Sequence, residues 1–234
     1  VAAMRDHVRI EVAAVEPGAR GVALGAGDAA QAEVLLRDGD RLGAEGLHLA
    51  GVVGEHRAGG GVRFGDAQRR LAGEIGAGGV QGNLNNARTR SRMVRSIAHT
   101  QKPLIAAVEG VCVGMAFAMA LASDFIICAN DARFQFAFRH IGLAMDAGAG
   151  WLLERHVGVM RAKEIAYTGR FVRGEEAAKL GFALEAVEPG EALVRARAFA
   201  DDLARAPTLA LSEMKRQFAA SPGQTFDEAL EYET

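Results

Sequence analysis

Two features between residues 102 and 158 have residue types suited to chemistry: a glycine-containing turn and the aspartate at position 146. The turn, Glu109 to Met115, follows an apolar stretch at residues 104–108 and precedes a run of small residues. If that run is a helix, its first N–H groups lack partners within the helix and carry partial positive charge. They would stabilise an oxygen that becomes negatively charged during a reaction. An ordinary tight turn of an α/β sheet has the same pattern, so both interpretations stay open.

Asp146 comes directly before a helix predicted over residues 147–157. A carboxylate in that place can be an N-cap, which stabilises a helix by about 1 kcal/mol. It can also be a general base or a nucleophile that faces the same cleft as the glycine turn. Residue type and position alone do not separate the cap from the two chemical roles.

Other residues in this part of the chain are weaker candidates. Glu109 ends the predicted strand, and it either points into the cleft or hydrogen-bonds the following turn. Trp151 is predicted to lie in the core or in the wall of a pocket. The arginines of a helix predicted over residues 88–99 form a solvated face, although an arginine cluster can also bind phosphate. Cys112 and Cys128 lie in apolar runs and are predicted to be small core residues.

The composition excludes several classes of protein. The chain has 234 residues and a formal net charge of −2, which fits one α/β domain and argues against nucleic acid as a partner. Its longest apolar stretch, residues 111–122, is too short to span a bilayer, so no membrane association is expected. The first residues lack a signal-peptide pattern, which leads us to expect a cytoplasmic protein. The sequence has no spacing typical of a metal site or a phosphate-binding loop, so no metal is expected.

The order of the predicted elements indicates an α/β fold. The stretch at residues 104–108 does not alternate between apolar and polar residues, which argues for burial on both faces, as in a parallel sheet. Together with a small-residue helix and a second buried strand, it forms a βαβ unit. The predicted elements are a hairpin from strands at 8–12 and 21–24, strands at 104–108, 125–129 and 182–187, helices at 114–122, 161–168 and 174–180, and further helices beyond residue 191.

From Lys102 to about Glu231, the sequence resembles the crotonase, or enoyl-CoA hydratase/isomerase, superfamily. The resemblance is carried by KPLIAAVEGVCVGMA, LASDFIICANDARFQF, IGLAMDAGAGWLLERHVG and AKEIAYTGRFVRGEEAAKLGFALEAV. The third of these phrases is most similar to the branch that contains the epoxyphenylacetyl-CoA isomerases and the enoyl-CoA isomerases.

The resemblance implies a fold and a mode of assembly. The fold is α/β, a crotonase-like spiral of ββα units over residues 1–185. A C-terminal helical region over residues 186–234 would take part in trimerisation and is shorter than is usual in the superfamily. The resemblance also implies a homotrimer or homohexamer that acts on an acyl-CoA thioester. Coenzyme A would enter only as part of the substrate, with no other cofactor.

An oxyanion hole of two backbone N–H groups for the thioester oxygen is also implied by the resemblance. Matching the glycine turn puts one donor at Met115, where superfamily members usually have glycine. The other donor belongs to an Ala-Gly-Gly segment, and Ala58 is preferred over Ala77 because a predicted strand precedes it. The residues assigned to substrate binding are Gly59, Gly114, Phe138 and Trp151.

The expected chemistry depends on which carboxylates this sequence has at the positions that match the catalytic residues of the superfamily. Ala118 and Phe138 stand where the hydratase branch has two glutamates, and neither side chain can move a proton. Asp146 matches the carboxylate of the epoxide-isomerase branch. The predicted function is therefore an acyl-CoA isomerase that moves a double bond or opens an epoxide through an enolate, with Asp146 as acid and base. The alternatives are a dehalogenase or thioester hydrolase in which Asp146 is the nucleophile, and an acyl-CoA-binding protein whose chemistry has degraded.

Overall fold

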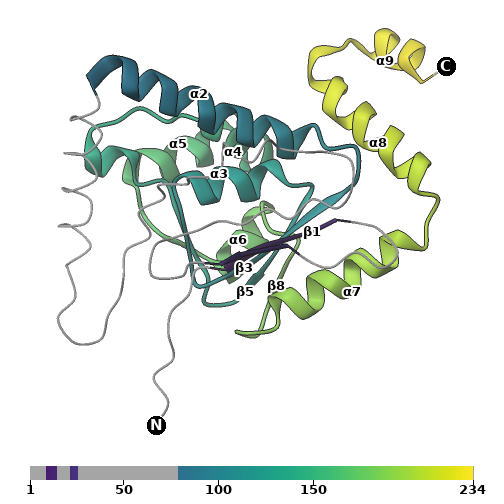
Figure 1. Cartoon of the computed structure of the whole chain (residues 1–234), viewed down its shortest axis with the longest axis horizontal. Helices are drawn as coiled ribbons and strands as arrows, with labels where there is room; N and C mark the ends of the chain where they lie inside the picture. The colour runs from purple at the N-terminus through teal and green to yellow at the C-terminus, as the bar shows by residue number, and fades with distance from the viewer. Residues whose placement is uncertain (1–8, 15–21, 26–78, 234) are drawn as a thin grey trace.

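The computed structural model describes residues 9–14, 22–25 and 79–233 (Figure 1). Its main sheet has the strand order β2-β1-β3-β5-β8. β1 is antiparallel to β2, as the predicted hairpin requires, and also to β3, whereas β3, β5 and β8 run parallel. The strands are β1 (Arg9–Ala14), β2 (Val22–Gly25), β3 (Leu104–Glu109), β5 (Phe125–Ala129) and β8 (Glu185–Val187).

β3 is buried on both faces, which confirms the prediction from its unbroken apolar sequence. Ile105 and Ala107 form one core cluster with the alanines of α7 (Ala192–Ala204). The intervening Ala106 belongs to a second cluster on the opposite face, together with α3 (Met115–Ala122). In Figure 1, α7 lies on one side of the sheet while α2 and α3 lie on the other. The sheet is thus the middle layer between helices.

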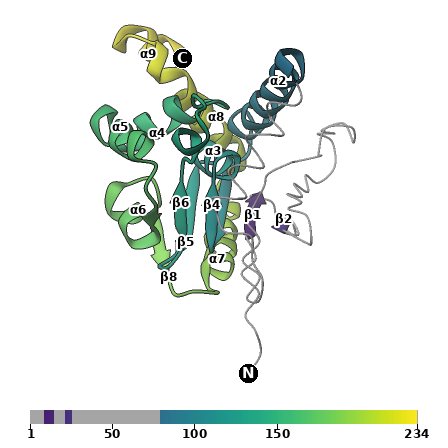
Figure 2. The same ribbon diagram turned by 90° about the vertical axis from the view of Figure 1, so that its left-hand side faces the viewer.

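A small second sheet has the order β4-β6-β7. It consists of β4 (Val111–Val113), β6 (Arg133–Gln135) and β7 (Val172–Arg173), and Figure 2 shows β4 and β6 side by side. Behind it, Phe117 of α3 stacks on Phe136 with ring centroids 4.5 Å apart. The same ring lies 5.2 Å from Phe134, so the second sheet and α3 share one aromatic core.

The helices around the sheet largely follow the predicted pattern, with three shifted starts, one of them that of the helix predicted over residues 161–168, which begins at Val159. α2 (Gly79–Ala98) begins well before residue 88, and α4 (Ala149–Val157) begins two residues after the predicted 147. The others are α5 (Val159–Thr168), α6 (Gly174–Leu180) and the 3-10 helix η1 (Phe138–Ile141). None of the helices in the described ranges combines the length and apolar character required to cross a membrane.

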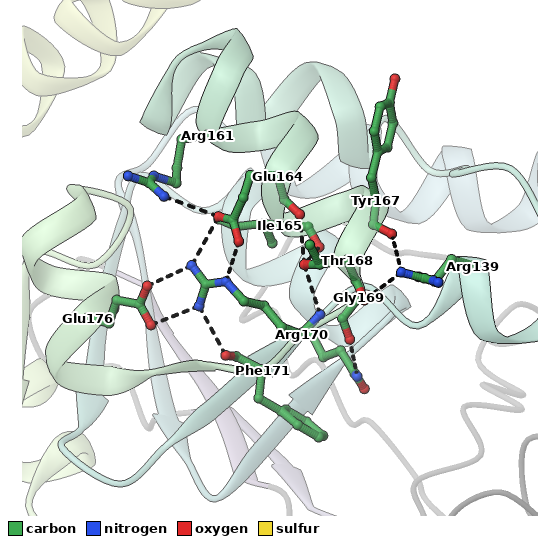
Figure 3. Close-up of polar contacts among 11 residues, drawn as sticks. Arg139, Arg161, Glu164, Ile165, Tyr167, Thr168, Gly169, Arg170, Phe171 and Glu176 are labelled. Atoms are coloured by element: carbon green, nitrogen blue, oxygen red, sulfur yellow. Dashed lines mark hydrogen bonds and ion pairs between the residues drawn. The ribbon is translucent and has the colours of Figure 1, made fainter.

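A cluster of ion pairs holds α5 and α6 together (Figure 3). The Arg170 guanidinium donates to both carboxylate oxygens of Glu164 on α5 and to both of Glu176 on α6. These hydrogen bonds lower the pKa of Glu164 and raise that of Arg170. Nearby, Arg139 donates to the carbonyl oxygens of Tyr167 and Thr168 at the end of α5, where cations are favoured by the helix dipole. Arg170 therefore joins α5 to α6 through both carboxylates, and Arg139 joins η1 to the end of α5.

The C-terminal helices extend from the rest of the protein as an arm (Figure 1). The arm consists of α8 (Thr208–Ala220), η2 (Ser221–Gly223) and α9 (Phe226–Tyr232), none of which has a buried residue. Lys215 of α8 reaches the sheet, because its Nζ lies 2.7 Å from Asp124 Oδ2 and 3.0 Å from the carbonyl oxygen of Lys102. The Lys215 side chain is only 10% exposed, so the contact is shielded from water.

We expect Lys215→Met to detach the arm, because the Asp124 carboxylate would lose its cation. Hydrogen bonds to charged groups contribute about 1–3 kcal/mol. Limited proteolysis between α7 and α8 should therefore be faster in the variant. The control is Arg216→Gln, which breaks a pair with Glu213 whose side chains are 58% and 60% exposed. Equal cleavage rates in the two variants would contradict a holding role for Lys215.

Candidate active site

The segment between β3 and α3 is a short strand between two glycines, and not a simple turn. Gly110 and Gly114 have φ values of 66° and 61°, which non-glycine residues rarely adopt. β4 lies between them, and the Gly114 N–H donates to the Gln135 carbonyl of β6 at 2.9 Å. The glycines therefore allow the chain to leave one sheet, join the other and then begin α3.

Met115 is the first residue of α3, and its N–H group has no acceptor within the helix. The first bond of the helix runs from the Ala118 N–H to the Gly114 carbonyl at 3.0 Å. The N–H groups of Met115, Ala116 and Phe117 precede that bond, as is usual for a helix start. The N-cap Gly114 carries no side chain that could accept from them. The start of α3 thus has the donors that the sequence predicts for an oxyanion.

Asp146 is not the N-cap of α4. The helix begins at Ala149, its N-cap is Gly148, and no side chain caps it. The Asp146 carboxylate instead accepts from Arg90 of α2, whose Nε lies 2.7 Å from Oδ2. Arg90 Nη2 lies 2.7 Å from the same oxygen. The capping interpretation of Asp146 is therefore wrong, and its chemical role stays a prediction.

The backbone next to Asp146 is strained. Ala147 has a φ of 53° and is the one residue other than glycine with positive φ in the described ranges. Its side chain is only 5% exposed, and Gly148 continues the left-handed turn with a φ of 71°. For an alanine this conformation costs on the order of 1 kcal/mol, and such strain is common at functional sites. The two residues delay the start of α4 and separate Asp146 from the helix.

The helices that carry these segments pack against one another. α3 packs against both α2 and α4, and the Arg90–Asp146 pair joins α2 to the segment before α4. His156 of α4 lies at the other end of α3, with its Nε2 3.2 Å from the Leu121 carbonyl. Burial lowers the pKa of His156, so its neutral form is favoured there.

The remaining predicted site residues have different outcomes. Phe138 lies in η1, half-buried, with its ring centroid 5.8 Å from that of Phe136. Trp151 is 54% exposed with the Arg155 guanidinium 3.4 Å from its ring centroid, so a core position is wrong and a role in substrate binding stays a prediction. Ala58, Gly59 and Ala77 lie outside the described residues, and the first oxyanion donor also stays a prediction.

Glu109 has a structural partner that the sequence did not predict. Its carboxylate accepts from the Gly190 N–H at 3.1 Å and from the Ala192 N–H at 3.0 Å. These groups lie at the start of α7, where a negative charge is favoured. Glu109 therefore caps α7, whose first residue lies 83 positions further along the chain. Within the part of the chain that the structure describes, it bonds neither the following turn nor a group in the cleft.

The two thiols are not suited to nucleophilic catalysis. Cys112 and Cys128 are both free and buried, as predicted for core residues. Burial raises the pKa of Cys128 to about 12 and that of Cys112 further, so neither is a thiolate near neutral pH. Among the described residues, no group of three or more His, Cys, Asp and Glu side chains could hold a metal ion.

We expect Glu109→Ala to lower the free energy of unfolding by about 1 kcal/mol, the usual effect of losing a helix cap. The midpoint of urea unfolding measures this change. Glu191→Ala is the matched control, because Glu191 occupies the N-cap position of α7 without a side-chain cap bond. An equal loss of stability in both variants would contradict the capping role of Glu109.

Comparison with known proteins gives matches to one family. Residues 74–234 match the family described as enoyl-CoA hydratase/isomerase. The chain is 39% identical over 128 residues to a "Probable enoyl-CoA hydratase" of Rhodobacter capsulatus, which covers 55% of this chain and 50% of that protein. It is 35% identical over 141 residues to the 1,2-epoxyphenylacetyl-CoA isomerase of Escherichia coli, covering 60% and 54%. The chain thus spans about half the length of these two relatives.

The solved structures point to the same fold. An enoyl-CoA hydratase from Polaromonas sp. JS666 superposes with a TM-score of 0.67 and 28% sequence identity. The superposition covers 70% of this chain and 64% of that structure. The arrangement of the parallel strands, the second sheet and the helices is therefore that of a crotonase-like α/β fold with a C-terminal helical region.

Proposed function

The chain belongs to the enoyl-CoA hydratase/isomerase family, and from that premise we propose that it is an acyl-CoA isomerase. In this proposal an acyl-CoA thioester binds between the start of α3 and Asp146. Coenzyme A enters only as part of the substrate. The reaction moves a double bond or opens an epoxide through an enolate.

The observation that carries the proposal is the state of the Asp146 carboxylate. It is 27% exposed, it does not cap α4, and both contacts from Arg90 go to Oδ2. Oδ1 has no hydrogen-bond partner among the described residues. A carboxylate with one open oxygen, held in place by an arginine through the other, is suited to accept a proton at the open oxygen.

The proposed steps conserve atoms and electrons. Asp146 removes a proton from the carbon alpha or gamma to the thioester carbonyl, and the electron pair moves to the carbonyl oxygen. The Met115 N–H and a second donor, assigned to Ala58, hold the enolate oxygen. One such donor lowers the barrier by about 3 kcal/mol. Asp146 then returns the proton to another carbon, so that substrate and product are isomers.

The isomerase is preferred to a hydratase because the matched positions lack the second acid. Ala118 is 1% exposed and offers a methyl group, and Phe138 offers an aromatic ring. Adding water across a double bond needs groups that activate the water and deliver a proton. An isomerase can use one carboxylate for both proton transfers.

We expect Asp146→Asn to lower kcat by about a hundredfold or more, because the amide cannot accept the proton. The measurement is turnover of a series of 3-enoyl-CoA substrates, with acyl-CoA binding followed by calorimetry. Asp131→Asn, an exposed aspartate after β5, is the control for the change of charge.

Each other outcome of that experiment points to a different function. Unchanged kcat in Asp146→Asn rules out the proposed role of Asp146. An acyl group found on Asp146 by mass spectrometry of a quenched reaction indicates a nucleophile and therefore a dehalogenase or hydrolase. Binding without turnover by the unmodified protein, across all acyl groups tried, indicates a binding protein.

The assembly is part of the same proposal: a homotrimer or homohexamer built through the C-terminal arm. The arm carries exposed apolar side chains, with Leu209 83%, Phe218 79% and Phe226 77% exposed. Single apolar residues on a surface are common, but three along one unburied arm are typical of a subunit contact. Sedimentation should give a trimer or hexamer for the unmodified protein and smaller species for Phe218→Glu. A monomer in both cases would contradict the assembly.

A further inference from the structure

We propose that Arg90 is the positioning residue of the site, because it holds one oxygen of Asp146 and leaves the other to react. This inference rests on the proposed function. It adds a residue outside the phrases that carry the family resemblance, and it assigns the two oxygens of Asp146 different tasks.

The first argument is the geometry of the pair. Arg90 Nε and Nη2 both lie 2.7 Å from Asp146 Oδ2. A bidentate arginine–carboxylate pair instead uses two nitrogens for two oxygens, and both oxygens are then occupied. The convergence on Oδ2 fixes the rotation of the carboxylate without occupying Oδ1.

The ion pairs at the α5–α6 junction give the contrast (Figure 3). There Arg170 donates to both oxygens of Glu164 and to both oxygens of Glu176. Those carboxylates hold two helices together and have no oxygen without an arginine contact. Asp146 differs from them in this respect, as a reacting group must.

The second argument is the absence of other supports for Asp146. Residues 143–146 belong to neither a helix nor a strand, and Leu143 and Met145 are 40% and 38% exposed. The Asp146 carbonyl accepts from the Ala149 N–H, but this bond fixes the main chain and not the carboxylate. Among the described residues, Arg90 is the group that orients the side chain.

α2 is a suitable rigid support for Arg90. Val94 and Ile97 of the same helix are 7% and 6% exposed and belong to the main core cluster. Arg90 precedes them by four and seven residues, so the three side chains lie on one face of the helix. Arg88 and Arg95, by contrast, are exposed. The arginine that faces the core side of α2 is the one that reaches Asp146.

A structural role alone explains the pair less well. The two side chains are 35% and 27% exposed, and an isolated ion pair with that access to water contributes little to folding, in contrast to the bidentate network around Arg170. A small displacement of a reacting group, in contrast, can lower the rate about a hundredfold. The consequence of the pair should therefore be found in kcat and not in stability.

The test is a double-mutant cycle on kcat with Arg90→Gln and Asp146→Asn. We expect Arg90→Gln to lower kcat by about ten- to a hundredfold and to leave KM within about threefold. In the Asp146→Asn background, the same substitution should change kcat by less than about twofold. Arg90→Lys should recover part of the rate, and free guanidinium at sub-denaturing concentration should restore Arg90→Ala. Arg88→Gln, on the same helix, is the charge control and should resemble the unmodified protein.

The outcomes separate this inference from the proposed function. Loss of kcat in Asp146→Asn with normal kcat in Arg90→Gln overturns the positioning role and leaves the proposed function standing. Normal kcat in Asp146→Asn overturns the proposed function itself. Two further results would show that Arg90 acts on the substrate and would also overturn the inference. One is that the two substitutions lower kcat independently in the double variant, and the other is that Arg90→Gln raises KM alone. If Asp146→Asn has no detectable rate, the recovery by lysine and guanidinium decides, and failure of both overturns it.

Discussion

β3 is fixed at both ends by carboxylates, and the position of the candidate site depends on this. At its start, Asp124 Oδ2 accepts from the Leu104 N–H at 2.7 Å and also pairs with Lys215 of the arm. At its end, Glu109 caps α7. Since the strand is buried on both faces, it has little freedom to shift. The segment that follows it therefore delivers the start of α3 to a fixed place, where the amide donors need no rearrangement to act.

The two parts of the candidate site, the N–H donors at Met115 and the Asp146 carboxylate, are positioned by different kinds of interaction. The donors at Met115 depend on backbone geometry, which the glycines and the β4–β6 pairing determine locally. Asp146 depends on a side chain 56 residues away and on a strained left-handed residue beside it. The two segments are linked through α3, which packs against both α2 and α4. Displacement of α2 would therefore affect the carboxylate while leaving the amide donors in place.

The sequence predicted those parts of the fold that follow from local pattern. Residues 125–129 form the expected strand because their apolar run is continuous, and residues 174–180 form the expected helix between Gly174 and Gly181. The prediction placed the start of α4 two residues too early, because nothing in the amino-acid sequence indicates that Ala147 has a positive φ. Trp151 was predicted in the core or in the wall of a pocket. The structure exposes it, and Arg155, one turn later on the same helix, covers its ring.

The sequence predicted which residues belong to the candidate site but not which residues they contact. Asp146 and the start of α3 could be identified, but the choice between a cap and a chemical role required the partner of Asp146. The predicted roles of Glu109 were wrong for the same reason, since the N–H groups that donate to its carboxylate lie 81 and 83 residues further along the chain. One signal in the sequence does bear on Arg90: it shares a helix face with Val94 and Ile97, where a charged side chain needs a buried or functional partner.

A single carboxylate also limits the chemistry under the proposed function. A proton that Asp146 removes must be returned by the same group, because Ala118 and Phe138 offer no second acid. Retention of that proton between the two steps requires that bulk water be kept from Oδ1 while the enolate exists. Arg90 occupies Oδ2 and so leaves Oδ1 as the oxygen that would carry the proton. The arrangement thus favours transfer of one proton between two carbons of the same substrate over reactions that consume water.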